Sequence, residues 1–450
     1  MPLSRGALGQ WRSRTTFVLA LSASAVGLGN LWRFPYLLGE HGGGPFMLAY
    51  LACLFLVATP LLIAEVVIGS HGRGSPPVAM RWAADRSLRS RAWVLAGLIA
   101  CLAGLLLLAV YAVVAGWSMA FAAATVSGEF GAASALEVSN FFGGLVNDVS
   151  ASIAWISLFI AVVTGIVALG IRRGIGLFVW FAVPAMFALL IVLIDFALTH
   201  GDLVAAREFL FAFQTLDFDA RSLLVALSHA FYTLGIGVGV GISYGAYSQS
   251  RIPIARSVLA VALFDAALAV MAGVAVMPLV FAANVEPGMG PALTFVAMPY
   301  VFGNVAEGEL YGTLFFVLVI IAALGSTVAL LEPLVGALKQ HLRLRRLTAA
   351  VIAGGALWCL SALAAISLAG DSDPGLPWFR LLDQLATYWL IPLAALMLAL
   401  FVGWQMQPVL RREQLYRAGP VLYGGWLFLL RYVSVPAIIV ILLANLVRYA

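Results

Sequence analysis

Two glycine-rich stretches inside apolar segments decide the fold. The first reads Ser22-Ala-Ser-Ala-Val-Gly-Leu-Gly-Asn-Leu-Trp-Arg-Phe-Pro-Tyr36, and the second reads Phe231-Tyr-Thr-Leu-Gly-Ile-Gly-Val-Gly-Val-Gly-Ile-Ser-Tyr244. Each glycine disfavours a helix by about 1 kcal/mol relative to alanine. In the second stretch glycine recurs at every other position, which wraps around a helix and does not form a Gly-xxx-Gly packing seam. We therefore interpret both stretches as membrane helices that are broken in mid-membrane.

The composition around these stretches requires lipid as the solvent. The chain has 450 residues, of which 63% are hydrophobic and only 10% charged, and its mean hydropathy is +1.04. The three cysteines lie inside apolar runs without metal-ligand spacing, so we interpret them as packing residues. We expect no cleaved leader, because a short apolar core with a small-residue cleavage site is missing. Apolar runs long enough to cross a bilayer predict helices near 16–38, 46–70, 93–125, 150–170, 174–199, 221–248, 255–283, 310–338, 347–369, 381–407 and 421–447.

The charged residues predict the orientation of these helices. If the loops alternate between two sides, most of the 25 Lys and Arg residues fall on the side of the N-terminus, and the opposite loops hold mainly acids. The positive-inside rule then places the N-terminus in the cytoplasm, and an odd number of spans places the C-terminus outside. The basic residues are therefore orientation signals, and we expect no nucleic-acid partner.

A broken helix at membrane depth has a chemical use. Its unwound backbone is tolerated only where it lines a cavity or is buried by protein. The freed carbonyls can hold a cation, while the N-terminus of a half-helix offers N–H groups to an anion. Breaks in spans one and six are also where two five-helix halves of an inverted repeat correspond. We expect one transporter domain over residues 1–450, with a first repeat at about 16–199, a second at about 221–407 and an extra helix at about 421–447.

Several motifs carry a family resemblance. Gly29-Asn-Leu-Trp-Arg-Phe-Pro-Tyr36, followed by Gly42-Gly-Gly-Pro-Phe46, resembles the first-helix signature of the neurotransmitter:sodium symporter family, in its bacterial amino-acid branch. The resemblance implies an all-α, polytopic membrane protein with the LeuT-like fold, a 5+5 inverted repeat and about 11 transmembrane helices. It implies a transporter and not an enzyme, located in the bacterial inner membrane, which takes up an amino acid with sodium by alternating access. It extends over most of the chain, through Pro60, Glu65, Tyr111, Trp117, Thr233 to Tyr247, Leu324-Gly-Ser-Thr327, Pro333 and Asp383.

The resemblance also implies two sodium sites. The first takes Ala25, Asn30, Thr233 and Asp265, where many relatives have Asn in place of Asp265. A fixed carboxylate at this place would supply the charge that chloride provides elsewhere, so we expect no chloride requirement. The second site takes Ala23, Val26, Ala322 and Ser326, but Gly325 stands where the family has a further ligand.

The family's substrate pocket falls on twelve positions of this chain. The hydroxyl of Tyr111 corresponds to the group that meets the substrate carboxylate, and Gly27 stands where carriers of monoamines have an aspartate. Gly235 and Val238 leave room for a side chain in a mostly apolar pocket, so a hydrophobic L-amino acid with a large aliphatic or aromatic side chain is the expected substrate. The pocket positions are Ala25, Leu28, Gly29, Leu107, Tyr111, Tyr232, Thr233, Gly235, Val238, Ser326, Thr327 and Leu330.

The family closes this pocket with two gates. Arg33 and Asp383 match the outer pair. The inner charged pair is replaced by Leu8 and Gln340, whereas the aromatic residues Trp11 and Tyr247 remain, so aromatic packing or a displaced residue such as Arg5 is expected there. We expect Glu65 and Glu332 to be structural acids that bond to neighbouring backbone.

Other classes of protein fit these residues less well. An enzyme is disfavoured because the buried polar residues contain no His/Glu metal cluster, phosphate loop or Ser-His-Asp set. A channel would show a filter repeat or require several chains around a pore. A proton-coupled carrier and a non-transporting sensor on the same fold both stay open. The exact amino acid, the sodium stoichiometry and the oligomeric state are not defined by the sequence.

Overall fold

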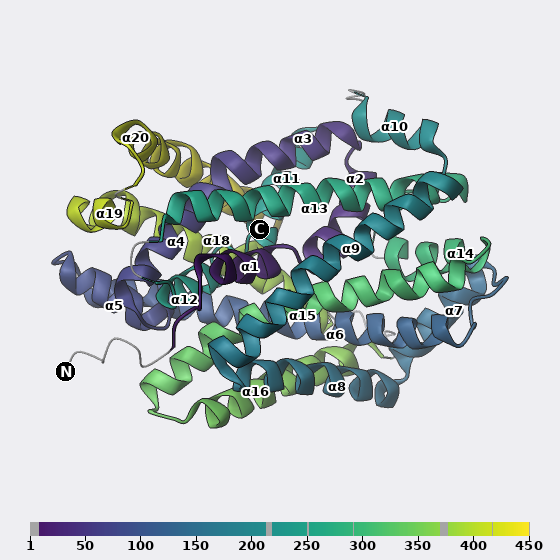
Figure 1. The fold of residues 1–450 in the computed structure, drawn as a ribbon, viewed down its shortest axis with the longest axis horizontal. Helices are drawn as coiled ribbons and strands as arrows, with labels where there is room; N and C mark the ends of the chain where they lie inside the picture. The colour runs from purple at the N-terminus through teal and green to yellow at the C-terminus, as the bar shows by residue number, and fades with distance from the viewer. Residues whose placement is uncertain are drawn as a thin grey trace.

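The protein is described by a computed structural model, which covers residues 9–212, 218–249, 252–290, 292–369, 377–415 and 417–449. Within these ranges all regular secondary structure is helical. The long helices run side by side along the long axis of the molecule, and short helices lie near its two ends (Figure 1).

The helices are numbered in chain order, with η for a π-helical or 3-10 segment. The first half contains α1 (Arg14–Ala25), η1 (Gly29–Arg33), α2 (Phe34–Glu40), α3 (Gly44–Cys53), η2 (Leu54–Ala58), α4 (Thr59–Gly72), α5 (Pro76–Arg86), η3 (Arg91–Trp93), α6 (Val94–Val126), α7 (Ala135–Asn147), α8 (Val149–Ala168), η4 (Ile171–Ile175), α9 (Gly176–His200) and α10 (Leu203–Phe211). The second half contains α11 (Ala220–Thr233), α12 (Val240–Ala246), α13 (Ile254–Ala282), η5 (Leu293–Ala297), α14 (Met298–Gly303), α15 (Gly308–His341), α16 (Arg346–Leu368), α17 (Trp378–Gln384), η6 (Leu385–Leu390), α18 (Ile391–Leu400), η7 (Phe401–Gln405), α19 (Pro408–Gln414), α20 (Pro420–Phe428), η8 (Leu429–Ser434) and α21 (Val435–Tyr449).

These helices form the eleven predicted spans. Nine described helices are long and apolar enough to cross a membrane, and the bent pair Arg14–Ala25 and Gly29–Glu40 makes a tenth. The eleventh consists of α11 and α12, which pack against α3 and α4 respectively. Because α3, η2 and α4 form one continuous helix (Gly44–Gly72), α11 and α12 follow its two halves and act together as one broken span.

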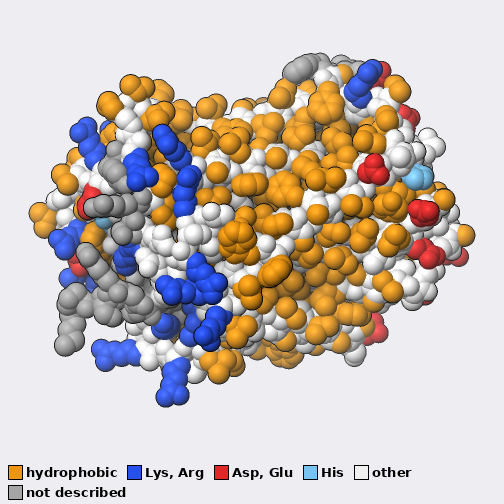
Figure 2. All heavy atoms as spheres, viewed as in Figure 1, with side chains coloured by type: hydrophobic (Ala, Val, Ile, Leu, Met, Phe, Trp, Pro, Cys, Tyr) orange, Lys and Arg blue, Asp and Glu red, His pale blue; other side chains and the backbone are white. Residues whose placement is uncertain are grey.

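The surface matches a protein embedded in a bilayer. Figure 2 shows a broad band of hydrophobic side chains, with Lys and Arg gathered at one end of the molecule and Asp and Glu at the other. Because water is excluded from a bilayer core, such a band is stable only against lipid. The chain is therefore a multi-pass membrane protein.

Both predicted breaks are present. In the first span, Val26 leaves the helical conformation with φ −79° and ψ 74°, and the two half-helices differ in direction by 41°. In the sixth span, Gly235, Gly237 and Gly239 have φ values of 63°, 76° and 76°. Only glycine adopts this left-handed region without steric cost, so the alternating glycines are what allow the chain to unwind here. The freed N–H of Gly237 donates to Glu65 Oε1 at 2.7 Å, which confirms the expected role of Glu65.

Short helices outside the spans were not predicted. The first turn of α7 is a capping box, in which the Ser134 hydroxyl accepts from the Glu137 N–H while the Glu137 side chain accepts from the Ser134 N–H. The Ser-x-x-Glu pattern is a recognised start signal for a helix and could have located α7 from the sequence.

The close packing of α4 on α12 gives a test of the fold. A Cβ at Gly69 would lie 1.9 Å from the carbonyl oxygen of Ile242, so Gly69→Ala forces the two helices apart. We expect a loss of about 1–3 kcal/mol of stability, read as a lower melting temperature of the purified protein. The matched control is Gly143→Ala in α7, where a Cβ has nothing within 4 Å and the helix should gain slightly. Equal melting temperatures for the two variants would contradict this packing.

Candidate functional site

The two unwound segments lie against each other in the protein interior. A Cβ at Gly29, at the start of η1, would lie 3.2 Å from Thr233 Cγ2 and 3.2 Å from Tyr232 Cδ1 at the end of α11. The break of the first span is therefore in direct contact with the break of the sixth. Both are fully enclosed, since every predicted pocket residue is buried.

A polar network lies beside these breaks. Asn30 Nδ2 donates to Asp265 Oδ1 at 2.7 Å, and the hydroxyl of Tyr50 donates to Asp265 Oδ2 at 2.6 Å. The same hydroxyl lies 3.2 Å from Thr233 Oγ1. Three of the four residues predicted for the first sodium site are thus brought together by η1, α11 and α13. The fourth, Ala25, is the last residue of α1, where its carbonyl accepts from the Gly27 N–H at 3.0 Å outside the regular helix pattern.

The free acceptors of this network suit a hard cation. Asn30 Oδ1 is buried and has no hydrogen-bond partner among the described residues. The fully buried carboxyl group of Asp265 has no basic side chain among its hydrogen-bond partners in the described chain. A buried carboxylate is costly without a compensating charge, and a bound cation would provide one. Carboxylate, amide and backbone carbonyl oxygens can serve this purpose together.

The residues predicted for the second sodium site also meet. Ser326 Oγ donates to the carbonyl oxygen of Ser24 at 3.3 Å, which joins α15 to α1. A Cβ at Gly27 would lie 1.7 Å from Ser326 Oγ and 3.6 Å from the carbonyl oxygen of Ala322. A Cβ at Gly325 would lie 2.5 Å from the carbonyl oxygen of Ala23. The two helices approach so closely here that a side chain at 325 would meet backbone, while one at 27 would require the Ser326 side chain to move. Val26, the remaining predicted ligand, is where α1 leaves the helical conformation.

The predicted substrate residues surround the same breaks. The rings of Tyr111 on α6 and Tyr232 on α11 meet edge to face, with centroids 5.6 Å apart. Leu107 is one helical turn before Tyr111. A Cβ at Gly104 would lie 3.2 Å from the carbonyl oxygen of Val238, so α6 also borders the unwound segment.

The remaining pocket positions come from the breaks and from α15. A Cβ at Gly235 would have only ordinary contacts, at 3.6 Å to Ser24 Oγ and to Val238 Cγ2. Leu28 at the first break is fully buried. On α15 the hydroxyl of Thr327 donates to the carbonyl oxygen of Ala323 at 2.5 Å, and Leu330 is one turn further on.

The predicted outer pair is not in direct contact. The guanidinium carbon of Arg33 lies 4.6 Å from the ring centroid of Tyr232, a cation–π arrangement. Within the described residues Arg33 has no ion pair shorter than 4.0 Å, and Asp383 Oδ1 accepts from the Thr387 hydroxyl at 3.2 Å. The positive charge of Arg33 nevertheless interacts electrostatically with Asp383.

The inner aromatic pair forms part of a larger cluster. The backbone N–H of Trp11 donates to the carbonyl oxygen of Tyr247 at 2.9 Å, and the two rings meet edge to face with centroids 5.9 Å apart. The hydroxyl of Tyr247 donates to Glu332 Oε1 at 2.5 Å, and Arg346 Nη1 donates to the same oxygen at 3.0 Å. The side chains of Glu332 and Arg346 are 0% and 16% exposed.

This cluster corrects one expectation. Glu332 does not bond to neighbouring backbone, because α15 packs against both α12 and α16 and meets the side chains of Tyr247 and Arg346 there. Gln340 Oε1 accepts from the backbone N–H of Ser75 at 2.7 Å, so its amide is used in packing α5. Leu8 and Arg5 lie outside the described residues.

Three residues of the site were missed by sequence reasoning. They are Tyr50, Arg346 and His229. Tyr50 joins Thr233 to Asp265, and Arg346 neutralises Glu332. The ring of His229 stacks on that of Phe34, with centroids 5.7 Å apart. Both ring nitrogens of His229 are buried without a hydrogen-bond partner in the described chain. Polar side chains inside apolar spans are the signal that could have found Tyr50 and His229.

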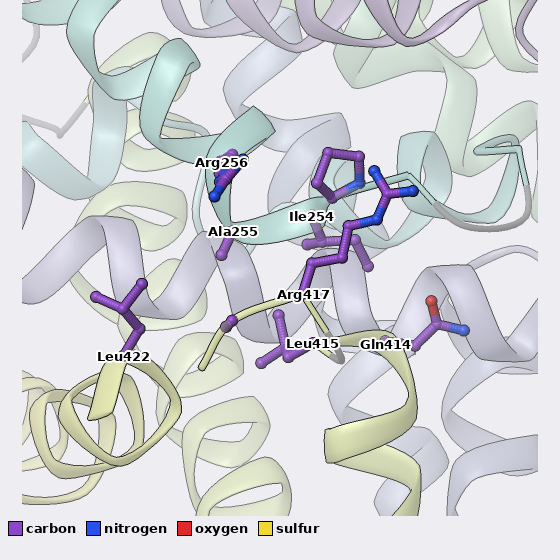
Figure 3. A pocket seen from close by; sticks show the side chains of 9 residues that line it. Ile254, Ala255, Arg256, Gln414, Leu415, Arg417 and Leu422 are labelled. Carbon is purple, nitrogen blue, oxygen red and sulfur yellow. The ribbon is translucent and has the colours of Figure 1, made fainter. Parts of the chain in front are cut away.

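One small surface cavity is not a substrate site. It lies between the start of α13 and the segment that follows α19, and its volume is about 30 Å³ (Figure 3). Ile254, Leu415 and Leu422 line it together with the arginines 256 and 417. This volume holds little more than a water molecule, so an amino acid would not fit.

Comparison with known proteins agrees with the geometry. The model of the sodium:neurotransmitter symporter family matches residues 8–140 and 143–450. The chain is 30% identical to the sodium-dependent transporter YhdH of Bacillus subtilis over 97% of both chains. It is 24% identical to a sodium- and chloride-dependent betaine transporter of Caenorhabditis elegans, over 74% of this chain and 63% of that one. The crystal structure of MhsT in complex with L-phenylalanine is similar with a TM-score of 0.89 and 33% identity, over 97% of this chain and 99% of that one.

The buried pair of Glu332 and Arg346 gives a test of the inner cluster. Arg346→Gln leaves the Glu332 carboxylate buried without a counter-charge, and we expect a loss of about 3–5 kcal/mol of stability. The double variant Arg346→Gln with Glu332→Gln should recover most of it, because no buried charge remains. Arg345→Gln, at the exposed neighbouring position, is the matched control. Thermal melting in one detergent compares the variants, and equal melting of the Arg345 and Arg346 variants would show that the pair is not buried as described.

Proposed function

The chain belongs to the sodium:neurotransmitter symporter family, and from this premise we propose that it imports a hydrophobic L-amino acid together with sodium. It is a sodium-dependent membrane transporter of this family and not an enzyme. We propose further that residues 1–450 form one domain, whose repeats at about 16–199 and 221–407 alternate between outward-facing and inward-facing states. The helix at about 421–447 is additional to the two repeats.

The network of Asn30, Thr233 and Asp265 is the observation that carries this proposal. It combines an unpartnered buried amide oxygen with a buried carboxyl group at the break of two membrane helices. Sodium is a hard cation that prefers oxygen ligands, and its charge would offset the cost of burying the carboxylate. Tyr50 orients Asp265 by donating to the oxygen that Asn30 does not use.

We propose a second sodium ion between α1 and α15. Its ligands would be the carbonyls of Ala23, Val26 and Ala322 and the hydroxyl of Ser326. The close approach of Ala23 to Gly325 leaves no room for a side chain at 325, so this site has one ligand fewer than its family counterpart. We therefore expect the second ion to bind more weakly than the first.

The fixed negative charge of the Asp265 carboxylate would make a chloride ion unnecessary. Asp265 lies within hydrogen-bond distance of both Asn30 and Tyr50, next to the proposed first sodium ion. A carboxylate there balances the bound cation without a mobile anion. We propose that transport is independent of chloride.

Two observations support an amino-acid substrate: the site has no place for an acidic partner of a cationic substrate, and the chain is similar to MhsT. A substrate cation would need an acidic partner, but a side chain at Gly27 would collide with Ser326, so an aspartate does not fit there without rearrangement. The L-phenylalanine in the MhsT structure is an amino acid with a large aromatic side chain. Buried apolar residues around the breaks, such as Leu107, Val238 and Leu330, suit a side chain of that kind.

Two closures would separate the site from water on either side. We propose that Arg33 and Tyr232 close the site on the extracellular side, and that Asp383 moves into contact with Arg33 when substrate binds. The cytoplasmic closure would be formed by Trp11, Tyr247, Glu332 and Arg346. This assignment of sides assumes a bacterial inner membrane with the N-terminus in the cytoplasm. Opening inward requires the Tyr247–Glu332 hydrogen bond or its surroundings to rearrange.

Uptake into proteoliposomes tests the function. With an inward sodium gradient, we expect radiolabelled phenylalanine, leucine or a similar amino acid to accumulate at least about tenfold above the level with an equal potassium gradient. Replacing chloride by gluconate at constant sodium should leave uptake within about twofold. Accumulation driven by a proton gradient alone would point to a proton-coupled carrier. Sodium-dependent binding without any uptake would point to a sensor.

Tyr111 and Gly235 test the placement of the substrate. Tyr111→Phe removes only the hydroxyl that meets the carboxylate, and a hydrogen bond to a charged group contributes about 1.5–3 kcal/mol, or roughly ten- to over a hundredfold in affinity. The loss should be similar for small and large amino acids. Gly235→Ser adds volume beside the substrate side chain, so large substrates should lose more than alanine.

Sodium binding is the control for the Gly235 variant. Gly235 has a φ of 63°, so any side chain there strains the unwound segment as well as filling space. If Tyr111→Phe discriminates by substrate size while Gly235→Ser weakens all substrates equally, the substrate lies in the opposite orientation.

A further inference from the structure

A large basic pocket lies at the end of the molecule where Lys and Arg gather, away from the transport site. Its volume is about 1020 Å³, it is open on one side, and it is bordered by α5, the end of α4, the start of α6 and the end of α15. Figure 2 shows that end of the molecule crowded with basic side chains. The titratable lining residues are His71, Arg73, Arg81, Asp85, Arg86, Arg91 and His341. One acid against four arginines leaves the pocket strongly positive.

Two of the arginines are free to bind an anion. Arg91 is neutralised by Asp85, with Nε and Oδ1 2.9 Å apart, and Arg73 donates to backbone carbonyls that include that of Ala246. Neither Arg81 nor Arg86 has an ion-pair partner among the described residues, and the guanidinium carbon of Arg86 lies 5.7 Å from the ring centroid of Trp82. Arg81 and Arg86, both on α5, are therefore the lining arginines that have neither a hydrogen-bond nor an ion-pair partner in the described chain.

The pocket wall also has an unused hydrogen-bond donor. Gln340 Oε1 is held by the Ser75 N–H, which fixes the amide, but Gln340 Nε2 is buried and has no partner in the described chain. A buried donor without an acceptor is costly, so a bound acceptor group would stabilise it. An oxyanion placed between α5 and α15 would use this donor together with the arginines.

A path of leucines leads from the pocket into the membrane. Val94 lines the pocket and begins α6, and Leu95, Leu98 and Leu102 follow within about 100° of it around the helix. These three leucines are 51%, 49% and 46% exposed, in a helix long and apolar enough to span a bilayer. They form a strip of lipid-facing surface, which we call the leucine strip. A small soluble anion would make no contact with this apolar strip, whereas the acyl chain of a lipid would pack along it.

We propose that this pocket is a binding site for an anionic phospholipid. The headgroup phosphate lies between Arg81, Arg86 and Gln340, and an acyl chain follows the leucine strip. The ring of Trp82 stacks on that of His71, with centroids 5.3 Å apart. In this proposal Trp82 lies at the level of the lipid headgroups, where aromatic side chains are common. Basic pockets between membrane helices are a common form of headgroup recognition. The proposal is independent of the transported substrate.

The site touches the transport machinery through α15, and through Arg73, which donates to the carbonyl oxygen of Ala246 in α12. Gln340 and His341 are at the end of the helix that carries Ser326 and Glu332. A lipid bound to α5 and α15 together would hold this end of α15 in place while α1 moves. Lipid binding and transport can nevertheless be measured separately.

Native mass spectrometry of the full-length transporter in detergent tests the proposal. Phosphatidylglycerol and phosphatidylcholine with identical acyl chains are titrated in parallel, together with inorganic phosphate. We expect phosphatidylglycerol to bind at least about tenfold more tightly than phosphatidylcholine. Arg81→Gln with Arg86→Gln should weaken phosphatidylglycerol about thirtyfold, since one basic side chain contributes roughly fivefold to affinity for an anionic lipid.

Two further variants make the test specific. Arg343→Gln with Arg345→Gln removes the same charge from exposed positions outside the pocket and should leave binding unchanged. Leu95→Ala with Leu98→Ala should weaken phosphatidylglycerol but not inorganic phosphate. Unchanged melting temperatures without added lipid establish that the variants are folded.

Three outcomes would overturn the proposal. Equal weakening by the two arginine pairs would mean that the whole basic surface attracts lipid and the pocket does not. Inorganic phosphate that binds as tightly as phosphatidylglycerol would make the site one for a soluble anion. Phosphatidylcholine that binds equally well would show that the site does not select a lipid headgroup with a net negative charge.

Discussion

The architecture depends on how backbone polar groups are satisfied where no water is present. Two spans unwind in mid-membrane, and each unpaired N–H or carbonyl there costs several kcal/mol in hydrocarbon. In the sixth span, Glu65 satisfies one of these groups by accepting a hydrogen bond from the Gly237 N–H at 2.7 Å. The acid is itself fully buried, so α4 must pack tightly on α12, and glycine at 69 and 241 allows that approach.

The same constraint creates the site. A backbone that is held open but not fully paired offers carbonyls to a cation, and the side chains that converge on it are polar for the same reason. Asp265, Asn30 and Tyr50 form a network that leaves Asn30 Oδ1 without a partner in the described chain. The cation proposed for this site would offset the cost of burying these groups. Under that proposal, ion binding biases the conformation of the two broken helices, which is what coupling requires.

The sequence predicted much of this because glycine patterns and apolar runs are local signals. The eleven spans, both breaks and the role of Glu65 follow from spacing and from the family signature. The contacts of Arg33 and Glu332 did not follow. Arg33 lies over the ring of Tyr232 and not against Asp383, and Glu332 pairs with Arg346, fourteen positions away across a turn between two helices. Such partners depend on how α12, α15 and α16 cross, which no local pattern encodes.

By itself the sequence determined that this chain spans a membrane, that its first and sixth spans break, and which polar residues accompany the breaks. Composition and glycine spacing suffice for these conclusions, because lipid leaves the backbone few alternatives. Only the tertiary structure decided which groups meet. It placed Tyr50 between Thr233 and Asp265, put Ser326 where a side chain at Gly27 would be, and joined α5 to α15 around a basic pocket. These contacts link residues far apart in the chain, and their distances are set by helix packing.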